Sequence, residues 1–384
     1  MDRRIQYALL FLVIPLYTAQ GWLFESGSLV SQGLVLIWLL VDLYYTIAFI
    51  YNQEKTSIST TLFLFWIMIF LSWLLSPKVI NLQWSSISTY GDLKNIAIVL
   101  FSYFPFRYWL LHGYLKKKSL VVFLLLMTLA SVMAYFTLIK KFDVEYSVTN
   151  NTGYYFAMLV PFLGIMKNKK YSTAILMVLL YFCISSAKRG AILCMIVGIV
   201  LFFYFSLRNV SRKHRYSSMV FMIILCSIVL FFSYDTYMTN EYLQYRMEKT
   251  FTENDSSGRD VIYSTLISKY LDGNLFNLLC GYGFDQTLEK AGIFAHMDWL
   301  ELIVDHGLLG VLLYVNLFYS MIRYYNQNRK NISKDVAFIF LSMISCWLLK
   351  STFSMGYTHF FSFVFLAEYA LFENEVKKSK KIEL

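Results

Sequence analysis

Long apolar runs are the feature that most constrains how this chain can fold. Each run has about 16–23 residues, close to the roughly 20 that an α-helix needs to cross the hydrocarbon core of a bilayer. Hydrophobic residues make up 58% of the chain and charged residues only 15%, whereas ordinary globular domains are about 25% charged. The sequence therefore predicts an all-α, polytopic integral membrane protein of about 12 transmembrane helices. Residues 1–384 are expected to form a single transmembrane domain.

The predicted spans are residues 6–23, 29–51, 60–76, 95–113, 119–139, 152–166, 172–187, 190–207, 217–235, 299–322, 336–352 and 355–372. The first run follows Arg3 and Arg4, as in a signal peptide, but it is long and no small-residue cleavage site follows it. We therefore expect a retained anchor. The five cysteines are interpreted as packing residues, because none is spaced like a metal or redox pair.

The lysines and arginines are distributed unevenly over the connections between spans. Alternate connections, together with the two ends of the chain, hold about 21 of the 34 basic residues in short segments. The positive-inside rule assigns such segments to the cytoplasm, so both termini are predicted to be cytoplasmic. The net charge of +10 reflects this bias and favours anionic lipid headgroups. It does not indicate a nucleic-acid partner.

One connection, residues 235–298, is much longer than the others and lies on the predicted external side. Structureless loops of this length are uncommon unless they are functional. Residues 240–251 are expected to form a short helix. Ser257 and Asp260 fit a capping box that starts a second helix, which stops near Gly273. The sequence therefore predicts a large helical extracytoplasmic loop that folds as a lid.

Three short polar elements lie on the predicted external side. They are the turn Ser185-Ser186-Ala187-Lys188-Arg189-Gly190, the pair Gly258-Arg259 with Gly281-Tyr282-Gly283, and the segment His296-Met297-Asp298-Trp299-Leu300-Glu301 with Asp305-His306-Gly307-Leu308-Leu309-Gly310. In order and spacing they resemble the O-antigen polymerase and O-antigen ligase superfamily, which includes Wzy-type polysaccharide polymerases. Members carry an S-R-G-type turn, an external loop that opens with arginine, a G-Y-G element, an H-N-x-[YFW]-L motif and a G-x-x-G sequence leading into the next helix.

The resemblance covers about residues 150–320 and implies a GT-C-like glycosyltransferase architecture, in which the long loop carries part of the active site. The chain departs from the pattern at two places. Met297 stands where an asparagine usually follows the histidine, so any hydrogen bond of that amide is absent. Ala187 and Lys188 precede Arg189 where a serine usually does.

The resemblance also implies the reaction. The donor is an oligosaccharide linked through pyrophosphate to a polyprenyl lipid such as undecaprenol, and the sugar chain moves to a hydroxyl of an acceptor glycan. Such a site needs cations for the diphosphate, a base for the hydroxyl and an apolar path for the lipid. We expect no metal, nucleotide or other cofactor, because the donor is already activated and the sequence has no metal-spaced cluster or phosphate-binding glycine loop.

Arg189, assisted by Lys188, and Arg259 are the candidate pyrophosphate-binding residues. An arginine fork binds phosphate oxygens bidentately. Arg259 is also expected in the first turn of a helix, where free amides attract anions. The alternatives are a snorkelling side chain at a helix end for Arg189 and a solvated surface arginine for Arg259.

His296 is the candidate general base, because its ordinary pKa of about 6.5 lets it accept a proton near neutral pH. Asp298 and Glu301 are the candidate supporting carboxylates, either of which would orient the ring. The alternative for His296 is a capping or packing role. Four other ionisable residues are expected at membrane depth and are interpreted as structurally paired rather than chemical, namely Asp42, Arg107, Asp305 and His306.

The function favoured by these observations is a polysaccharide polymerase on the outer face of a bacterial plasma (inner) membrane. It would join lipid-linked repeat units into O-antigen, capsule or exopolysaccharide, with the bilayer and a chain-length regulator as candidate partners. The nearest alternative is the O-antigen ligase, which transfers a finished chain to a lipid A core. A lipid-linked sugar flippase or other transporter is the alternative of another class, although the related halves typical of transporters are not evident.

Overall fold

The computed structural model describes residues 2–77, 80–81, 86–87, 89–141, 150–209 and 258–382, together with isolated positions between residues 216 and 248. Most of the ninth predicted span, most of the predicted helix at 240–251, and Ser257 lie outside the described residues. The regular secondary structure of the described residues is helical except for one short antiparallel ladder, in which Ile80 pairs with Ile87 and Asn81 with Ser86.

The first half of the chain contains the helices α1 Asp2–Ala8, η1 Leu9–Val13, α2 Ile14–Thr18, α3 Leu29–Tyr51, α4 Ser59–Leu75, α5 Thr89–Phe101, α6 Tyr103–Leu111, α7 Lys117–Lys141, α8 Gly153–Leu159 and η2 Val160–Ile165, with the strands β1 Ile80–Asn81 and β2 Ser86–Ile87 between α4 and α5. The second half contains α9 Lys169–Ser185, α10 Arg189–Asn209, α13 Arg259–Leu271, α14 Leu275–Cys280, α15 Gln286–Ala291, α16 Asp298–Asn328, α17 Lys334–Phe353, η3 Phe360–Ser362 and α18 Phe363–Ile382.

Five of the described helices are long and apolar enough to cross a membrane, and they confirm the prediction of a polytopic all-α membrane protein. They are Leu29–Tyr51, Lys117–Leu138, Arg189–Arg208, Asp298–Asn328 and Lys334–Phe353. Two further apolar helices, Ser59–Leu75 and Gly153–Ile165, are shorter. The bounds of α3 match the predicted span, and those of α4, α10 and α17 lie within a few residues of it.

Several predicted spans are not single α-helices, and local chemistry explains the breaks. The first contains a π-helical turn at Leu9–Val13, just before Pro15, whose ring has no N–H to donate. The sixth tightens into a 3-10 helix around Pro161. The fourth is split at Ser102. The Ser102 hydroxyl donates to Asp42 at 2.9 Å and accepts from the Trp38 indole at 2.9 Å.

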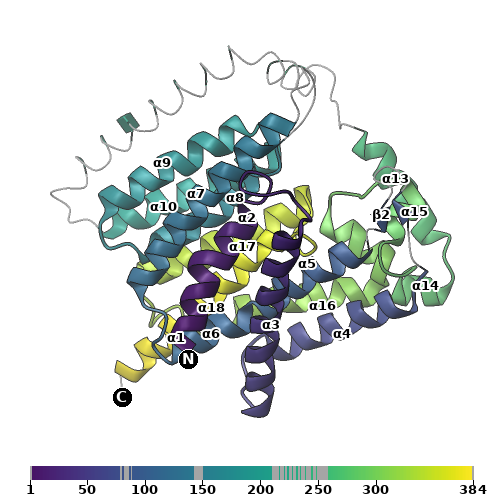
Figure 1. The fold of residues 1–384 in the computed structure, drawn as a ribbon, viewed down its shortest axis with the longest axis horizontal. Helices are drawn as coiled ribbons and strands as arrows, with labels where there is room; N and C mark the ends of the chain where they lie inside the picture. The colour runs from purple at the N-terminus through teal and green to yellow at the C-terminus, as the bar shows by residue number, and fades with distance from the viewer. Residues whose placement is uncertain are drawn as a thin grey trace.

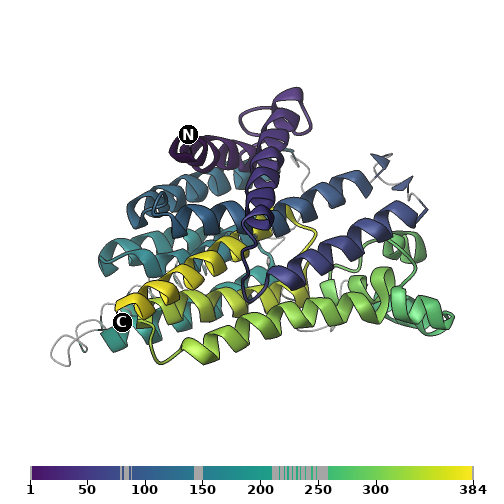
Figure 2. The same ribbon diagram turned by 90° about the horizontal axis from the view of Figure 1, so that it is seen from below.

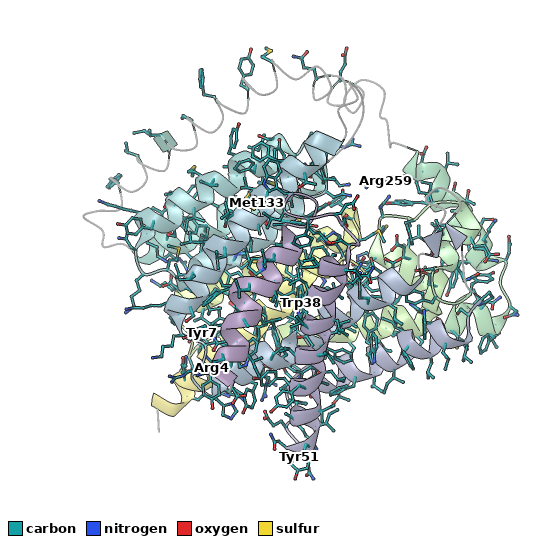
Figure 3. All side chains as sticks on the ribbon, in the orientation of Figure 1. Arg4, Tyr7, Trp38, Tyr51, Met133 and Arg259 are labelled. Carbon is teal, nitrogen blue, oxygen red and sulfur yellow. The ribbon has the colours of Figure 1, made fainter. Side chains whose placement is uncertain are left out.

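The core surrounds α18, whose residues from Phe363 to Asn374 are all buried. Figures 1 and 2 show α18 passing between α6 and α17, with both chain termini near the same end of the bundle. By contrast, α3 crosses the bundle steeply (Figure 2) and exposes a stripe of apolar side chains along its length. Such a stripe suits contact with lipid rather than water. Tyr51, at the tip of α3, is 85% exposed (Figure 3).

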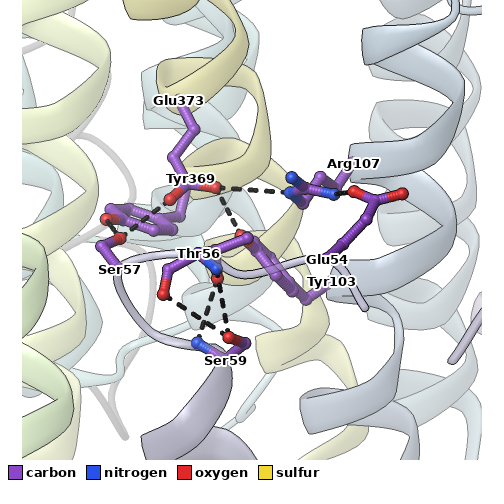
Figure 4. Close-up of polar contacts among 8 residues, drawn as sticks. All are labelled: Glu54, Thr56, Ser57, Ser59, Tyr103, Arg107, Tyr369 and Glu373. Atoms are coloured by element: carbon purple, nitrogen blue, oxygen red, sulfur yellow. Dashed lines mark hydrogen bonds and ion pairs between the residues drawn. The ribbon is translucent and has the colours of Figure 1, made fainter. Parts of the chain in front are cut away.

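Arg107 of α6 lies in a buried polar network, as predicted for a charge at membrane depth. Its guanidinium donates to Glu54 and lies 4.0 Å from the carboxylate of Glu373 (Figure 4). The hydroxyls of Tyr103 and Ser57 also donate to Glu373. The predicted structural pairing of Arg107 is therefore confirmed. Asp42 binds a hydroxyl instead of a cation, and its second carboxylate oxygen has no hydrogen-bond partner among the described residues.

The described part of the long connection is helical and forms a separate lobe. Helices α13, α14 and α15 pack against the first half of α16 (Figure 1). A small core holds this lobe together, made of Leu266, Ala295, Leu300 and Val304 with the flanking Ile262, Tyr263, Tyr270 and Tyr282. The lobe therefore has its own apolar packing, as expected of a folded loop rather than a structureless one.

Candidate active site

Three helix starts far apart in the sequence come together in the structure, those of α10, α13 and α16. Lys188 and Arg259 are near enough to His296 for their charges to act on its imidazole. Arg189 follows Lys188 directly as the first residue of α10. All four side chains are half-buried. Figure 3 shows Arg259 at the edge of the α13 lobe, between this lobe and the main bundle.

Two hydrogen bonds to backbone carbonyls hold the turn before α10. Ala187 has a φ of 52°, a left-handed conformation that is uncommon for residues other than glycine. The backbone N–H of Asn150 donates to the carbonyl of Ser186 at 3.2 Å, and the Tyr135 hydroxyl donates to the carbonyl of Ser185 at 3.2 Å. These contacts fix where Lys188 and Arg189 emerge.

Gly190 is required by close packing. A Cβ atom at this position would lie 2.1 Å from the hydroxyl of Tyr154 and 2.8 Å from the Cβ of Phe353. No real Cβ is found so close to its neighbours, so α10 approaches α8 and α17 only because residue 190 has no side chain. The glycine of the S-R-G-type turn therefore has a packing reason in this chain.

The start of α13 differs from the predicted capping box. Gly258 is the N-cap residue, with a φ of 74° and no side-chain cap, and Arg259 is the first helical residue. A left-handed backbone conformation is favourable for glycine, so Gly258 can adopt it directly before the first helical residue. The prediction that Ser257 is the cap was therefore wrong by one residue. Arg259 still lies in the first turn, as expected.

His296 precedes α16 and has a φ of 55°. Histidine is among the few residue types enriched in this conformation. Its backbone N–H donates to the Glu301 carboxylate at 2.9 Å. Met297 is the N-cap of α16 and makes no side-chain cap bond. The backbone before α16 is therefore held by a carboxylate in the first turn of that helix.

The pKa of His296 is lowered from 6.5 to about 4, first because burial disfavours the charged ring and then because Lys188 and Arg259 repel a proton. The lowered pKa favours the neutral imidazole near pH 7, the form in which one ring nitrogen can accept a proton. The imidazole is also a weaker base than an ordinary histidine, because the two cations oppose its protonation.

Asp298 is fully buried and organises the loop after α17. Its carboxylate accepts from the backbone N–H groups of Gly356 and Tyr357 at 2.6 and 3.2 Å, and from the Tyr314 hydroxyl at 2.9 Å. A Cβ on Gly356 would lie 2.3 Å from this carboxylate, so the loop approaches as glycine alone permits. These contacts of Asp298, like that of Glu301, do not involve the His296 ring. The ring-orienting role stays a prediction.

Lys350 of α17 is a part of this region that the sequence analysis did not identify. Its ammonium donates to the carbonyl of Met355 at 2.6 Å and to the hydroxyl of Ser362 at 3.0 Å, so it closes the same loop that Asp298 binds. It also lies over the ring of Tyr154 at 5.6 Å. The signal was present in the sequence, since a lysine inside an apolar span usually has a buried partner.

The G-Y-G element is structural in this chain. Helix α16 is kinked at Gly307, which has a φ of 64° and a ψ of −163°. The backbone N–H groups of Tyr282 and Gly283 donate to the carbonyls of Val304 and Asp305 at 2.8 and 2.9 Å. A Cβ on Gly281 would lie 2.3 Å from the Asp305 carbonyl. Gly281 and Gly307 therefore allow the backbone of the G-Y-G element to contact the backbone of α16 directly.

Asp305 and His306 lie beside this kink and form no ion pair in the described part of the chain. The Asp305 carboxylate accepts from the Thr287 backbone N–H at 2.6 Å and from its hydroxyl at 2.7 Å. His306 is 1% exposed, and its Nδ1 has no hydrogen-bond partner among the described residues. The Asp305 carboxylate is thus paired with neutral donors, whereas the Nδ1 atom of His306 is buried without a partner among the described residues.

An apolar cavity of about 570 Å³ adjoins the kink between α4, α14 and α16. Its wall includes Leu64, Leu71, Phe276, Leu309 and the Gly281–Gly283 backbone, with His306 as the buried polar residue. A cavity of this size and composition suits a hydrocarbon chain rather than a sugar.

One comparison with known proteins gives a family match over the region that contains the candidate site residues. Residues 174–315 match the family model described as O-antigen ligase. The matched region begins within α9, ends within α16 and includes Arg189, Arg259 and His296. No curated protein matches the sequence. This part of the chain, fewer than half of its residues, therefore resembles the O-antigen ligase family, and the match supports a glycosyltransferase-like role in O-antigen processing.

Proposed function

We propose that this protein polymerises oligosaccharide repeat units carried on polyprenyl pyrophosphate, at the outer face of the plasma membrane. The observation that carries the proposal is the convergence of two cationic side chains, Lys188 and Arg259, on the neutral imidazole of His296. A diphosphate needs the cations, and an acceptor hydroxyl needs the imidazole.

In the proposed reaction, His296 accepts the proton of an acceptor sugar hydroxyl. The hydroxyl oxygen forms a bond with the anomeric carbon of the donor sugar, and the bond between that carbon and the diphosphate oxygen breaks. The bonding electrons leave with the polyprenyl diphosphate. Arg189, Arg259 and Lys188 stabilise the negative charge that accumulates on it.

The lowered pKa of His296 links donor binding to base strength. Without donor, Lys188 and Arg259 oppose protonation of the ring. A bound diphosphate places negative charge beside the same cations and offsets their effect, so the pKa rises towards its ordinary value of about 6.5. The base is therefore strongest when the leaving group is in place. The apolar cavity beside α4 and α16 is the candidate path for the polyprenyl chain.

The test is complementation of surface-polysaccharide synthesis in a deletion strain at matched membrane expression. His296→Ala is expected to reduce chain formation by about 10²–10⁴-fold, and Arg189→Ala and Arg259→Ala to leave single repeat units on the lipid. His112→Ala and Arg329→Ala are matched controls, because both residues are exposed and lie at the C-terminal ends of their helices, whereas the candidate site is formed by helix starts. Wild-type chain lengths in all three site variants would contradict the catalytic assignment.

The O-antigen ligase is the second candidate, favoured by the description of the matching family model. A ligase and a polymerase would use the same donor and differ in the acceptor. In the deletion strain, full-length chains that remain on the lipid and do not reach their anchor would assign the ligase. Single unjoined repeat units would assign the polymerase. Continued assembly of lipid-linked units on the inner leaflet alone would instead indicate a flippase.

A further inference from the structure

A second cavity, of about 630 Å³, lies between the loop after α2, the end of α7 and the start of α8. The loop after α2 passes beside α8 in Figure 1. Unlike the cavity at α4, its wall combines hydroxyl, amide and carboxylate groups with the aromatic rings of Trp22, Tyr155 and Phe360. The mechanism proposed above does not use it.

This cavity shares a wall with the candidate active site. Thr152, in the wall, donates its hydroxyl proton to the side chain of Asn150, and the backbone of Asn150 binds Ser186 in the turn before Lys188. On the other side, the Tyr155 hydroxyl lies 3.5 Å from Nε2 of His359. His359 belongs to the loop whose Gly356 is bound by Asp298. Thr152 and Tyr155 thus connect the cavity to the two segments beside the candidate site.

The hydrogen-bonding groups in the wall include donors, from Gln20, Trp22, Ser26 and Tyr155, and acceptors. The hydroxyls of Thr18 and Thr137 donate to helix carbonyls at 2.9 and 3.0 Å, as Thr152 does to Asn150. Each hydroxyl has one proton and two lone pairs, so these oxygens retain the capacity to accept. The Glu25 carboxylate adds further acceptors. A ligand rich in hydroxyl groups, each of which can donate and accept, matches this arrangement.

This cavity differs in charge from the candidate active site. Glu25 is its charged lining residue, so an anionic diphosphate is disfavoured there and favoured beside Lys188 and Arg259. The aromatic rings offer apolar faces, and Trp22 is 39% exposed. A sugar ring has a hydroxyl edge and an apolar C–H face, and pockets that bind such ligands combine aromatic surface with a few placed polar groups.

We infer that this cavity is a subsite for uncharged sugar residues of the acceptor chain. The inference rests on the proposed function, because it assumes a glycan that is extended at the neighbouring site. A chain held there would keep its terminal hydroxyls beside the wall that the two sites share. The subsite would then select acceptors by their sugars, while the cations select donors by their diphosphate.

The experiment measures saccharide binding separately from catalysis. Purified protein in detergent is mixed with oligosaccharides released by mild acid from the surface polysaccharide of its own strain, and saturation-transfer NMR reports sugar protons that contact the protein. Trp22→Ala and Glu25→Gln are expected to reduce the signal at least threefold. Leu23→Ala is the matched control, because Leu23 is 48% exposed in the same loop but does not line the cavity.

The kinetic counterpart is a rise in KM for the acceptor of at least threefold in Trp22→Ala, with kcat unchanged, as expected when only ground-state binding is lost. Equal NMR signals in wild type, Trp22→Ala and Glu25→Gln would overturn the subsite. His296→Ala keeps the cavity intact and should bind the oligosaccharide normally. Full activity of His296→Ala together with loss of binding in Trp22→Ala would reject the proposed mechanism and retain the subsite.

Discussion

The carboxylate of Glu301 accepts a hydrogen bond from the backbone N–H of His296 at 2.9 Å. This bond joins the residue before α16 to the first turn of that helix. His296 has a left-handed backbone, which costs about 1–3 kcal/mol for a residue other than glycine. The Glu301 contact therefore helps to hold the candidate base in a conformation that it would not adopt alone.

Substitution of Glu301 should separate its acceptor role from its charge. Glu301→Gln keeps an oxygen that can accept from His296, and we expect activity within about tenfold of wild type, since a neutral bond contributes only about 0.5–1.5 kcal/mol. Glu301→Leu removes the acceptor and should lower polymerisation further. In vitro chain extension with matched amounts of enzyme measures both. Equal activity of the two variants would show that this bond does not position His296.

Met297→Asn should stabilise the protein, because it places a good capping residue at the N-cap of α16, where no side-chain cap exists. Asparagine at this position is expected to add about 0.5–2 kcal/mol. A thermal unfolding assay in detergent should show a higher Tm. Met297→Leu is the control, since it changes the side chain without adding an acceptor. A Tm for Met297→Asn at or below that of Met297→Leu would contradict the prediction.

The dependence of enzyme activity on pH should reflect the protonation of His296. Its pKa in the free protein is about 4, so the acid limb of kcat/KM is expected near pH 4, because this parameter reports the free enzyme. The acid limb of kcat should lie at higher pH, because donor binding offsets the cations. Stability should rise with pH between about 4 and 6.5, where the unfolded chain binds more protons than the folded one.

A variant gives the control for this assignment. Lys188→Ala removes one of the two cations that lower the pKa of His296 and should move the acid limb of kcat/KM upward. His296→Gln should abolish the limb altogether. An unchanged limb in His296→Gln would assign it to another group.

Gly190→Ala should destabilise the turn that presents Lys188 and Arg189. The new methyl group would lie 2.1 Å from the Tyr154 hydroxyl, and overpacking of this kind typically costs about 1–3 kcal/mol. Gly33→Ala in α3 is the matched control, because a Cβ there meets nothing within 4 Å. That control should have an unchanged or higher Tm, since alanine is favoured over glycine in helices by about 1 kcal/mol. Identical Tm values for the two variants would refute the packing argument.

Arg107→Met should affect folding rather than catalysis. It leaves Glu54 and Glu373 without their shared cation (Figure 4), and breaking a buried pair on one side typically costs about 3–5 kcal/mol. We expect a low yield of folded protein, measured by fluorescence-detected size-exclusion chromatography. The folded fraction should keep normal specific activity. Normal yield with lost activity would place Arg107 in the reaction instead.

The sequence alone determined the helical membrane architecture and the order of the motifs. Apolar runs long enough to cross a bilayer leave few alternatives to helices, because backbone groups in lipid must bond within their own segment. Helix starts also depend on neighbouring residues, so Arg259 was correctly expected in the first turn of its helix. Where a cap depends on backbone conformation, as at Gly258, the prediction was wrong by one residue.

Only the tertiary structure decided which groups meet. The proximity of Lys188 and Arg259 to His296 depends on how α10, α13 and α16 pack, and no local pattern encodes a contact over such sequence distances. The same holds for the contact of Asp298 with Gly356. The Asp298 carboxylate binds a loop 58 residues away in the sequence, because a buried carboxylate needs donors and the packed helices bring those of the loop to it.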